Sequence, residues 1–222
     1  MNKKFHKKPI GENGIIRITT PPNKNPSIRF VKNSLPTAKD EIEKSIINKF
    51  IRAGRKAGFT IHSCTKNTES HFDFTLVIGS QETVYVDLKE IIIPNKNNSP
   101  YKRTNKQIND EEYSNYIIKL IKECSEKYRS KSKTPIHLLL YITDWKFNPS
   151  NTVIALVQHA LLKQDLMFEY VFFLDIVADD YEELRLLFPS KKSRWIGFDP
   201  NNYKNSTTYN LNPSKWELSS NK

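Results

Sequence analysis

The residue pattern between Phe72 and Glu90 constrains the fold of this chain more than any other segment of its sequence. Within residues 83–89, apolar side chains at even positions alternate with larger or charged ones at odd positions, namely Tyr85, Asp87 and Lys89. Side chains along a β-strand point alternately to its two faces. The run therefore predicts a strand with one face in a hydrophobic core and an acid beside a base on the other face.

A second strand is expected at residues 71–78, because that run is also rich in aromatic and β-branched residues and ends in a glycine-containing turn. If Ile78 pairs with Glu82, Asp73 lies opposite Asp87. Directly opposed residues on one face have Cβ atoms roughly 4.5 to 5.5 Å apart. Two carboxylates at that separation are close enough to share a divalent cation.

Charged residues on a strand more often form a solvated outer face, and an Asp-x-Lys pattern alone arises by chance. Here the charges lie within a very apolar stretch that continues through residues 91–93. Charges beside a buried strand need ion-pair partners, a metal or a catalytic role. We therefore expect Asp73, Asp87 and Lys89 to belong to a functional site.

The charge of the chain favours a polyanionic partner. Its formal net charge is +11 over 222 residues, and Glu12 is the only acid before Thr37. Neutralising phosphates releases counterions and drives binding, so nucleic acid is the expected partner, and an anionic membrane surface is a less supported alternative. An AT-rich genome, which favours lysine and asparagine codons, is an alternative source of the same composition.

Length, cysteine content and apolar patterning exclude several classes of protein. A chain of 222 residues without repeats suits one domain with a sizeable core. Cys64 and Cys124 are too few for a disulfide framework and lack the spacing of a zinc site. No apolar run has the length of a signal peptide or a membrane span, so we expect a soluble, cytoplasmic protein without membrane contact. No Gly-rich loop ending in Lys-Ser/Thr is present, which predicts no nucleotide cofactor.

Hydrophobic periodicity predicts helices that alternate with strands. Helices are expected at residues 37–58, 109–126, 152–163 and 181–188, and strands at residues 15–20, 27–32, 59–65, 71–78, 84–93, 136–142 and 168–177. Thr37 and Asn109 are the expected caps of the first two helices. This order predicts an α/β fold with a mixed sheet between helices. We divide the chain into a basic N-terminal arm with a small hairpin (1–36), a main domain (37–188) and a polar C-terminal extension (189–222).

The order of elements and the charged positions together resemble the PD-(D/E)XK nuclease superfamily, which shares the restriction-endonuclease-like fold. That family has an α-β-β-β-α-β core, with an acid on the first helix, an Asp at the start of the second strand and an acid-x-Lys motif on the third. The corresponding positions are Glu43, Asp73, Asp87 and Lys89. The resemblance spans residues 37–177, and Phe72 stands where the family often has proline. Glu41 is the alternative helix acid, but Glu43 lies beside the apolar stripe of that helix.

The resemblance implies a Mg²⁺-dependent nuclease, with Mn²⁺ as a substitute. The metal ligands would be the carboxylates of Asp73, Asp87 and Glu43 and the backbone carbonyl of Leu88. Lys89 would orient or deprotonate the attacking water, or stabilise the transition state, and the sequence leaves these roles open. Specific cleavage of a duplex implies a homodimer, and the implied setting is restriction, defence or DNA processing.

A basic loop near the expected active edge offers candidates for nucleic-acid contact. Lys102, Arg103 and Lys106 lie there, next to the aromatic Tyr101. Basic and aromatic groups together suit the grip of a phosphate backbone, although a solvated loop explains them equally well.

Three functions are consistent with the sequence. The first is a Mg²⁺-dependent endonuclease that acts on DNA. The second is a non-catalytic nucleic-acid-binding or assembly protein that retains the nuclease fold, and the intact set of Asp73, Asp87 and Lys89 argues against it. The third is an RNA-cleaving toxin, which would use the same residues.

Overall fold

A six-stranded mixed sheet with helices on both faces forms the body of the protein in a computed structural model, which describes residues 11–20, 27–68, 71–94, 101, 107–129, 132–176 and 181–210. The strands are β1 (Gly14–Thr19), β2 (Ser27–Lys32), β3 (Ile61–Lys66), β4 (Phe74–Ile78), β5 (Glu82–Glu90), β6 (Gln107–Asn109), β7 (Ile136–Tyr141), β8 (Tyr170–Ile176), β9 (Glu182–Phe188) and β10 (Thr207–Tyr209). The helices are α1 (Lys39–Lys56), α2 (Asp110–Tyr128) and α3 (Asn151–Leu161), with 3-10 turns at Trp145–Phe147, Lys192–Trp195 and Pro200–Tyr203. The sheet has the strand order β3-β4-β5-β7-β8-β9.

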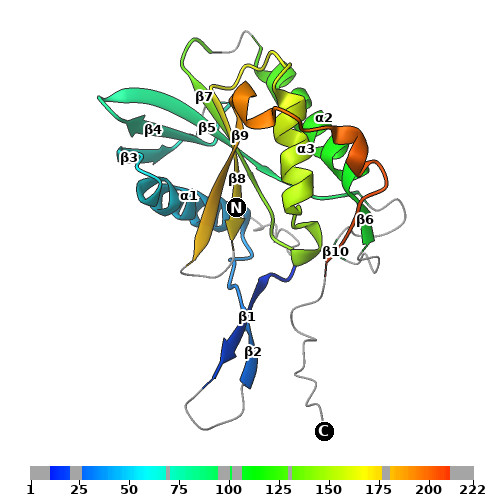
Figure 1. The fold of residues 1–222 in the computed structure, drawn as a ribbon. Coiled ribbons are helices and arrows are strands. Elements are labelled where there is room, and N and C mark those ends of the chain that lie inside the picture. The colour runs from blue at the N-terminus through cyan, green and yellow to red at the C-terminus, as the bar shows by residue number, and fades with distance from the viewer. Residues whose placement is uncertain are drawn as a thin grey trace, which may run out of the picture.

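The sheet is antiparallel at both edges and parallel in its centre. Strands β3, β4 and β5 form an antiparallel meander, β5, β7 and β8 run parallel, and β9 returns antiparallel to β8. Helix α1 covers one face, and α2 and α3 cover the other (Figure 1). The mixed α/β architecture expected from the sequence is therefore confirmed.

Two hydrophobic clusters hold these layers together. On the α1 face, Ile46 and Phe50 of the helix pack against Val84 and Val86 of β5. On the other face, Ile117 of α2 and side chains of α3 pack against alternate residues of β7 and β8. Fully burying side chains of this size stabilises a fold by about 1.5 to 3 kcal/mol each before entropy is subtracted. Strand β5, which carries Asp87 and Lys89, is therefore held by Val84 and Val86 on the α1 face and by Tyr85 on the other face.

The hairpin between β4 and β5 has the predicted register. Ile78 pairs with Glu82 and Phe74 pairs with Val86. Asp73 therefore lies one residue before the paired part of β4, at the end of the ladder where Asp87 follows Val86. Gln81 in the turn has a φ of 81°, a left-handed conformation that closes the hairpin. Strand β4 begins at Phe74, three residues later than expected, which leaves Asp73 at the end of the ladder rather than within it.

The expected helix at residues 181–188 is wrong, because β9 occupies this segment. Leu184 packs toward the α1 face of the sheet and Leu187 toward the α2 and α3 face. Residues three apart lie on the same side of a helix, whereas in a strand they point to opposite faces. Pairing with the edge of β8 thus outweighs the helical propensity of this Glu- and Leu-rich run.

The two predicted helix caps have different outcomes. Asn109 caps α2, and its side chain accepts a hydrogen bond from the backbone N–H of Glu112, as expected. Helix α1 begins at Lys39 with Ala38 as its cap and no side-chain cap hydrogen bond, so the expectation for Thr37 is wrong.

Segments outside the main sheet form two small ladders. Strands β1 and β2 make the expected N-terminal hairpin. Strand β10 pairs with β6 beside α2, so residues 207–209 of the polar extension fold onto the main domain, which the sequence did not reveal. The buried Asp110 secures them by accepting hydrogen bonds from the hydroxyls of Ser206 and Thr208. Within the described ranges, no helix has the length and hydrophobicity needed to cross a bilayer.

Candidate active site

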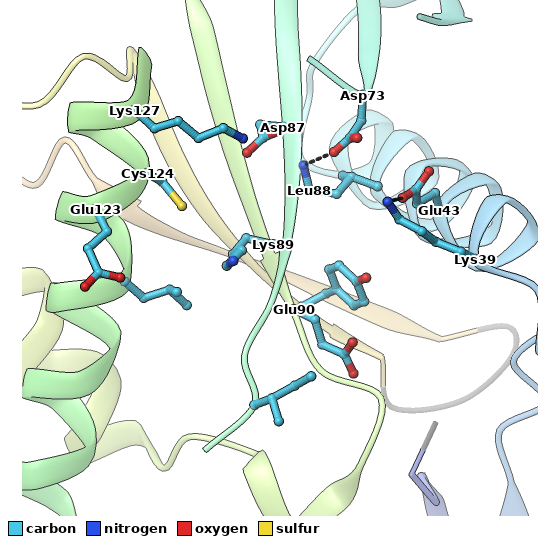
Figure 2. A pocket seen from close by; sticks show the side chains of 13 residues that line it. Lys39, Glu43, Asp73, Asp87, Leu88, Lys89, Glu90, Glu123, Cys124 and Lys127 are labelled. Carbon is cyan, nitrogen blue, oxygen red and sulfur yellow. Dashed lines mark hydrogen bonds and ion pairs between the residues drawn. The ribbon is translucent and has the colours of Figure 1, made fainter. Parts of the chain in front are cut away.

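A pocket of about 460 Å³ opens around the carboxyl-terminal half of β5, between α1 and α2. The side chains singled out from the sequence gather in it: Glu43, Asp73, Asp87, Leu88 and Lys89 all line its wall. Figure 2 shows that β5 divides the pocket, with Asp87 and Lys89 on the α2 side and Glu43 on the α1 side. Alternation along β5 places Asp87 and Lys89 on one face, and helix α1 brings Glu43 to the other.

Asp73 joins the two strands of the hairpin at the pocket. Its Oδ2 accepts a hydrogen bond of 2.8 Å from the backbone N–H of Leu88 (Figure 2). In an antiparallel ladder, the N–H and C=O of one residue point to the same side of the strand. The carbonyl of Leu88 therefore faces the side on which Asp73 lies, beyond the last paired residue of β4.

Phe72, the residue before Asp73, supports it by aromatic packing. The buried ring of Phe72 stacks on Tyr85, with centroids 4.6 Å apart and planes at 8°, and also contacts the ring of Tyr128 at 4.9 Å. Stacked aromatic pairs of this kind contribute roughly 0.5 to 1.5 kcal/mol beyond their buried area. Phe72 thus fixes the backbone that presents Asp73 by packing between the sheet and α2.

Asp87 is a buried carboxylate with a strongly shifted titration. Burial is the main cause that raises its pKa from an ordinary value of 3.8 to about 6, and the negative charge of Asp73 adds to the rise. A hydrogen bond from Tyr128 and the positive charges of Lys127 and Lys89 oppose the shift but do not cancel it. Asp87 therefore lies in a position where additional positive charge would be stabilising.

Asp73 is shifted in the same direction. Burial raises its pKa most, and the charge of Glu43 raises it further, while the Leu88 N–H hydrogen bond lowers it. Two neighbouring carboxylates that both resist ionisation indicate a site with too little positive charge of its own.

The last turn of α2 contributes groups that the sequence did not identify. Lys127 donates a hydrogen bond of 2.7 Å to the hydroxyl of Tyr128, and Figure 2 shows its ammonium group directed toward Asp87. Burial and the charge of Asp87 raise the pKa of the Tyr128 hydroxyl, so it stays protonated and donates to that carboxylate. Sequence patterns placed Lys127 in a basic turn after the helix. Only the helix that continues to Tyr128 brings it into the pocket.

Glu43 has cationic partners on the α1 side. Lys39, one helical turn earlier, lies 3.3 Å from its Oε1, and Lys66 of β3 lies 3.1 Å from its Oε2. Lys66 also pairs with Asp40. Of the two candidate helix acids, Glu43 lines the pocket, whereas Glu41 is exposed outside it.

Lys89 completes the predicted motif. It is half-buried, lines the pocket and lies on the same side of β5 as Asp87 (Figure 2). The nucleic-acid contacts predicted at Lys102, Arg103 and Lys106 lie outside the described residues. The neighbouring Tyr101 donates a hydrogen bond of 2.9 Å to Glu90 at the wall of the pocket.

The oxygen donors at this point suit a hard cation better than a soft one. No group of three or more His, Cys, Asp or Glu side chains able to hold a metal lies within the part of the chain that the structure describes. Mg²⁺, however, is commonly held by one or two carboxylates and keeps several waters, and Mn²⁺ accepts the same ligands. The carboxylates of Asp73 and Asp87 with the carbonyl of Leu88 fit that pattern, and their raised pKa values are those of a site that lacks positive charge.

Comparisons with known proteins do not place the chain in a family. No family model, no curated protein and no solved structure matches it. The function must therefore be argued from the residues and the geometry of the pocket.

Proposed function

We propose that this protein is a Mg²⁺-dependent phosphodiesterase that hydrolyses DNA, most consistent with an endonuclease. One observation carries the proposal: Asp73 binds the backbone between Asp87 and Lys89, at the wall of a pocket where buried carboxylates lack sufficient positive charge. Phosphodiester hydrolysis needs an activated water and neutralisation of charge on the phosphoryl oxygens.

The residues divide these tasks. Asp73, Asp87 and the carbonyl of Leu88 would hold the metal, which would lower the pKa of a bound water and neutralise phosphoryl oxygens. Lys89, on the same side of the strand as Asp87, would orient the attacking water or stabilise the charge of the transition state. Tyr128 would keep Asp87 in place through its hydrogen bond.

The charge of the protein supports a polyanionic substrate. The net charge of +11 favours association with phosphate backbones, and Lys127 adds a cation at the α2 side of the pocket. Cleavage of both strands of a duplex requires two such sites, so a homodimer is part of the proposal. Restriction, defence or DNA processing is the setting that suits such an activity.

A second candidate is a nucleic-acid-binding protein that keeps this architecture without catalysis. The ion pairs of Glu43 favour it, because Lys39 and Lys66 engage both oxygens of a carboxylate that a two-metal site would need. Under this alternative, Asp73 and Asp87 would be relics of a site and their loss would leave nucleic-acid binding unchanged.

Cleavage assays separate the two candidates. Supercoiled plasmid, single-stranded DNA and single-stranded RNA would be incubated with the protein in Mg²⁺, in Mn²⁺ and in EDTA. Metal-dependent cutting by the native protein that is lost in Asp87→Ala and Lys89→Ala supports the nuclease. The matched controls are Asp165→Ala and Lys122→Ala, which remove exposed charges away from the pocket. Binding without cutting of any substrate favours the non-catalytic alternative, and cutting of RNA alone would identify a ribonuclease.

A further inference from the structure

The β1–β2 hairpin stands out from the body of the protein as a separate ribbon. Figure 1 shows it extending away from the sheet, and none of its side chains that the structure describes belongs to the two core clusters. A two-stranded hairpin alone is marginally stable in water. A ribbon of this kind that contributes nothing to the core invites a functional explanation.

The base of the hairpin is attached to the sheet close to the pocket. Trp145 donates its backbone N–H to the carbonyl of Glu12 at 2.9 Å, and Asn13 donates its side-chain amide to the carbonyl of Ile176 at 3.2 Å. A Cβ on Gly11 would lie 2.1 Å from Cβ of the buried Asp144, so the backbone here lies directly against the segment that follows β7. The hairpin therefore has a fixed root.

That root and the pocket share one edge of the sheet. Strands β5, β7 and β8 run parallel, so their carboxyl ends meet at the same edge. Asp87 and Lys89 lie in the carboxyl-terminal half of β5, and the anchors of the hairpin directly follow β7 and end β8. Thr143, which precedes the anchor Asp144, donates a hydrogen bond to Glu90 at the wall of the pocket. A ligand long enough to span this edge of the sheet would contact both the pocket and the hairpin.

The hairpin carries two arginines directly opposite each other. Arg17 of β1 pairs in register with Arg29 of β2, and both side chains are exposed. Like charges at directly opposed positions are destabilising. Within the described part of the chain, neither guanidinium has an ion-pair partner, and the acid at the base, Glu12, lies 3.7 Å from Lys32. The arrangement fits a ligand that brings closely spaced negative charges.

We infer that the β1–β2 hairpin is a substrate-binding arm, whose Arg17 and Arg29 contact the phosphate backbone of a DNA duplex that also reaches the pocket. A two-stranded ribbon has the width to enter the major groove, and arginine binds phosphate oxygens with two parallel hydrogen bonds. The inference rests on the proposed function, because it assumes that the pocket receives DNA, and it adds that the substrate is a duplex.

The test measures binding without cleavage. The full chain in EDTA would be titrated against a short fluorescein-labelled DNA duplex at several salt concentrations, and against one of its single strands. The variant is the double substitution Arg17→Ser and Arg29→Ser. The matched control is Lys122→Ser with Lys163→Ser, which removes two exposed cations from other surfaces.

We expect the arginine variant to bind the duplex on the order of 10- to 30-fold more weakly near physiological salt. The slope of log K against log salt should become shallower by about 1.8, which corresponds to two lost phosphate contacts. The control should change affinity by less than about twofold, and the single strand should lose less affinity than the duplex. Because both arginines are exposed and the substitution removes their mutual repulsion, the thermal midpoint should not fall.

Equal affinity and slope for the arginine variant and the control would overturn the arm. A change in the sedimentation mass of the arginine variant without a change in its DNA affinity would also overturn the proposal. The hairpin would then be a contact between copies of the chain. The apolar face of the hairpin, where Ile18 is 60% exposed, makes that outcome worth measuring. If the native protein binds duplex through the arm but cuts nothing, the nuclease proposal fails and the arm stands. If the native protein cuts DNA but the arginine variant binds the duplex like the control, the nuclease proposal stands and the proposed role of the hairpin fails.

Discussion

Two buried carboxylates, Glu182 and Asp87, lie in opposite halves of the sheet and show opposite electrostatic behaviour. Glu182 begins the edge strand β9 and its side chain is fully buried. Burial alone would raise its pKa, but hydrogen bonds and charges from Arg52 and Lys56 of α1 outweigh burial and lower it. The positive charges of Arg52 and Lys56 therefore fully compensate the effect of burial on Glu182.

Asp87 is also buried, but its neighbours do not fully compensate the effect of that burial. Burial raises its pKa to about 6, and the hydrogen bond from Tyr128 with the charges of Lys127 and Lys89 reverses only part of the shift. A carboxylate matched to protein cations fastens one element to another, as Glu182 fastens β9 to α1. A carboxylate left short of positive charge is a candidate for an external cation, which is the role that we assign to Asp87.

The largest expected effect separates the two carboxylates by activity. Asp87→Asn should reduce the rate of DNA cleavage at least about 10³-fold, because it removes a charged metal ligand. Glu182→Gln should leave the rate within about twofold, since Glu182 is not among the residues that line the pocket. Single-turnover cleavage of a labelled duplex in Mg²⁺ measures both. Similar losses of cleavage rate in the two variants would mean that the rate falls because the fold is destabilised, and not because a metal ligand is lost.

Without metal, the two carboxylates should make the free energy of unfolding depend on pH in opposite ways. The folded state holds the proton of Asp87 up to about pH 6, whereas the unfolded chain releases it near its ordinary value of 3.8. The native protein therefore loses stability as the pH rises between about 4 and 6. Asp87→Asn lacks this loss and should be more stable than the native protein at pH 8 by about 3 kcal/mol, but not at pH 4.

Urea unfolding in EDTA at the two pH values is the measurement. A native protein that is the more stable of the two at pH 8 would show that Asp87 is already neutralised by its neighbours. Glu182→Gln should have the opposite effect on the free energy of unfolding, because the carboxylate of Glu182 stabilises the fold when it is ionised.

Glu182→Gln should lower the free energy of unfolding at pH 7 by about 1 to 2 kcal/mol. It leaves Arg52 and Lys56 without their anion, but both are about half exposed and can turn to water, which limits the cost. Equilibrium denaturation checks the value. No loss of stability would mean that the ion pairs do not fasten β9 to α1.

The smallest expected effect concerns the cation beside Asp87. Lys127→Met should slow cleavage by about tenfold, because one positive charge near the phosphate is lost while the apolar stem is kept. Lys122→Met on the exposed face of the same helix is the control. Equal rates for the two variants would remove Lys127 from the site.

Local sequence signals predicted the centre of the site. The hairpin register of Ile78 with Glu82 follows from the turn between them, and the cap at Asn109 follows from residues three apart. Both depend on neighbours in sequence, so pattern reasoning reached them. The same register brought Asp73 next to β5, where it meets the backbone of Leu88.

Contacts between distant segments were beyond such patterns. Residues 182–188 have helical composition and become a strand only because the edge of β8 is available. The ion pair of Lys66 with Glu43 joins β3 to α1, and no spacing in the sequence indicates it. Lys127 enters the pocket because packing extends α2 to Tyr128. The residues that gather at the pocket could thus be predicted from the sequence, whereas their electrostatic surroundings depend on the fold.

Calorimetric titration with Mg²⁺ and Mn²⁺ at pH 6 and pH 8 tests the central claim most directly. The account predicts that the native protein and Glu182→Gln bind metal, that binding releases protons at pH 6 but few at pH 8, and that Asp87→Asn does not bind. Metal binding that survives in Asp87→Asn, or an absence of binding by the native protein at both pH values, would contradict it.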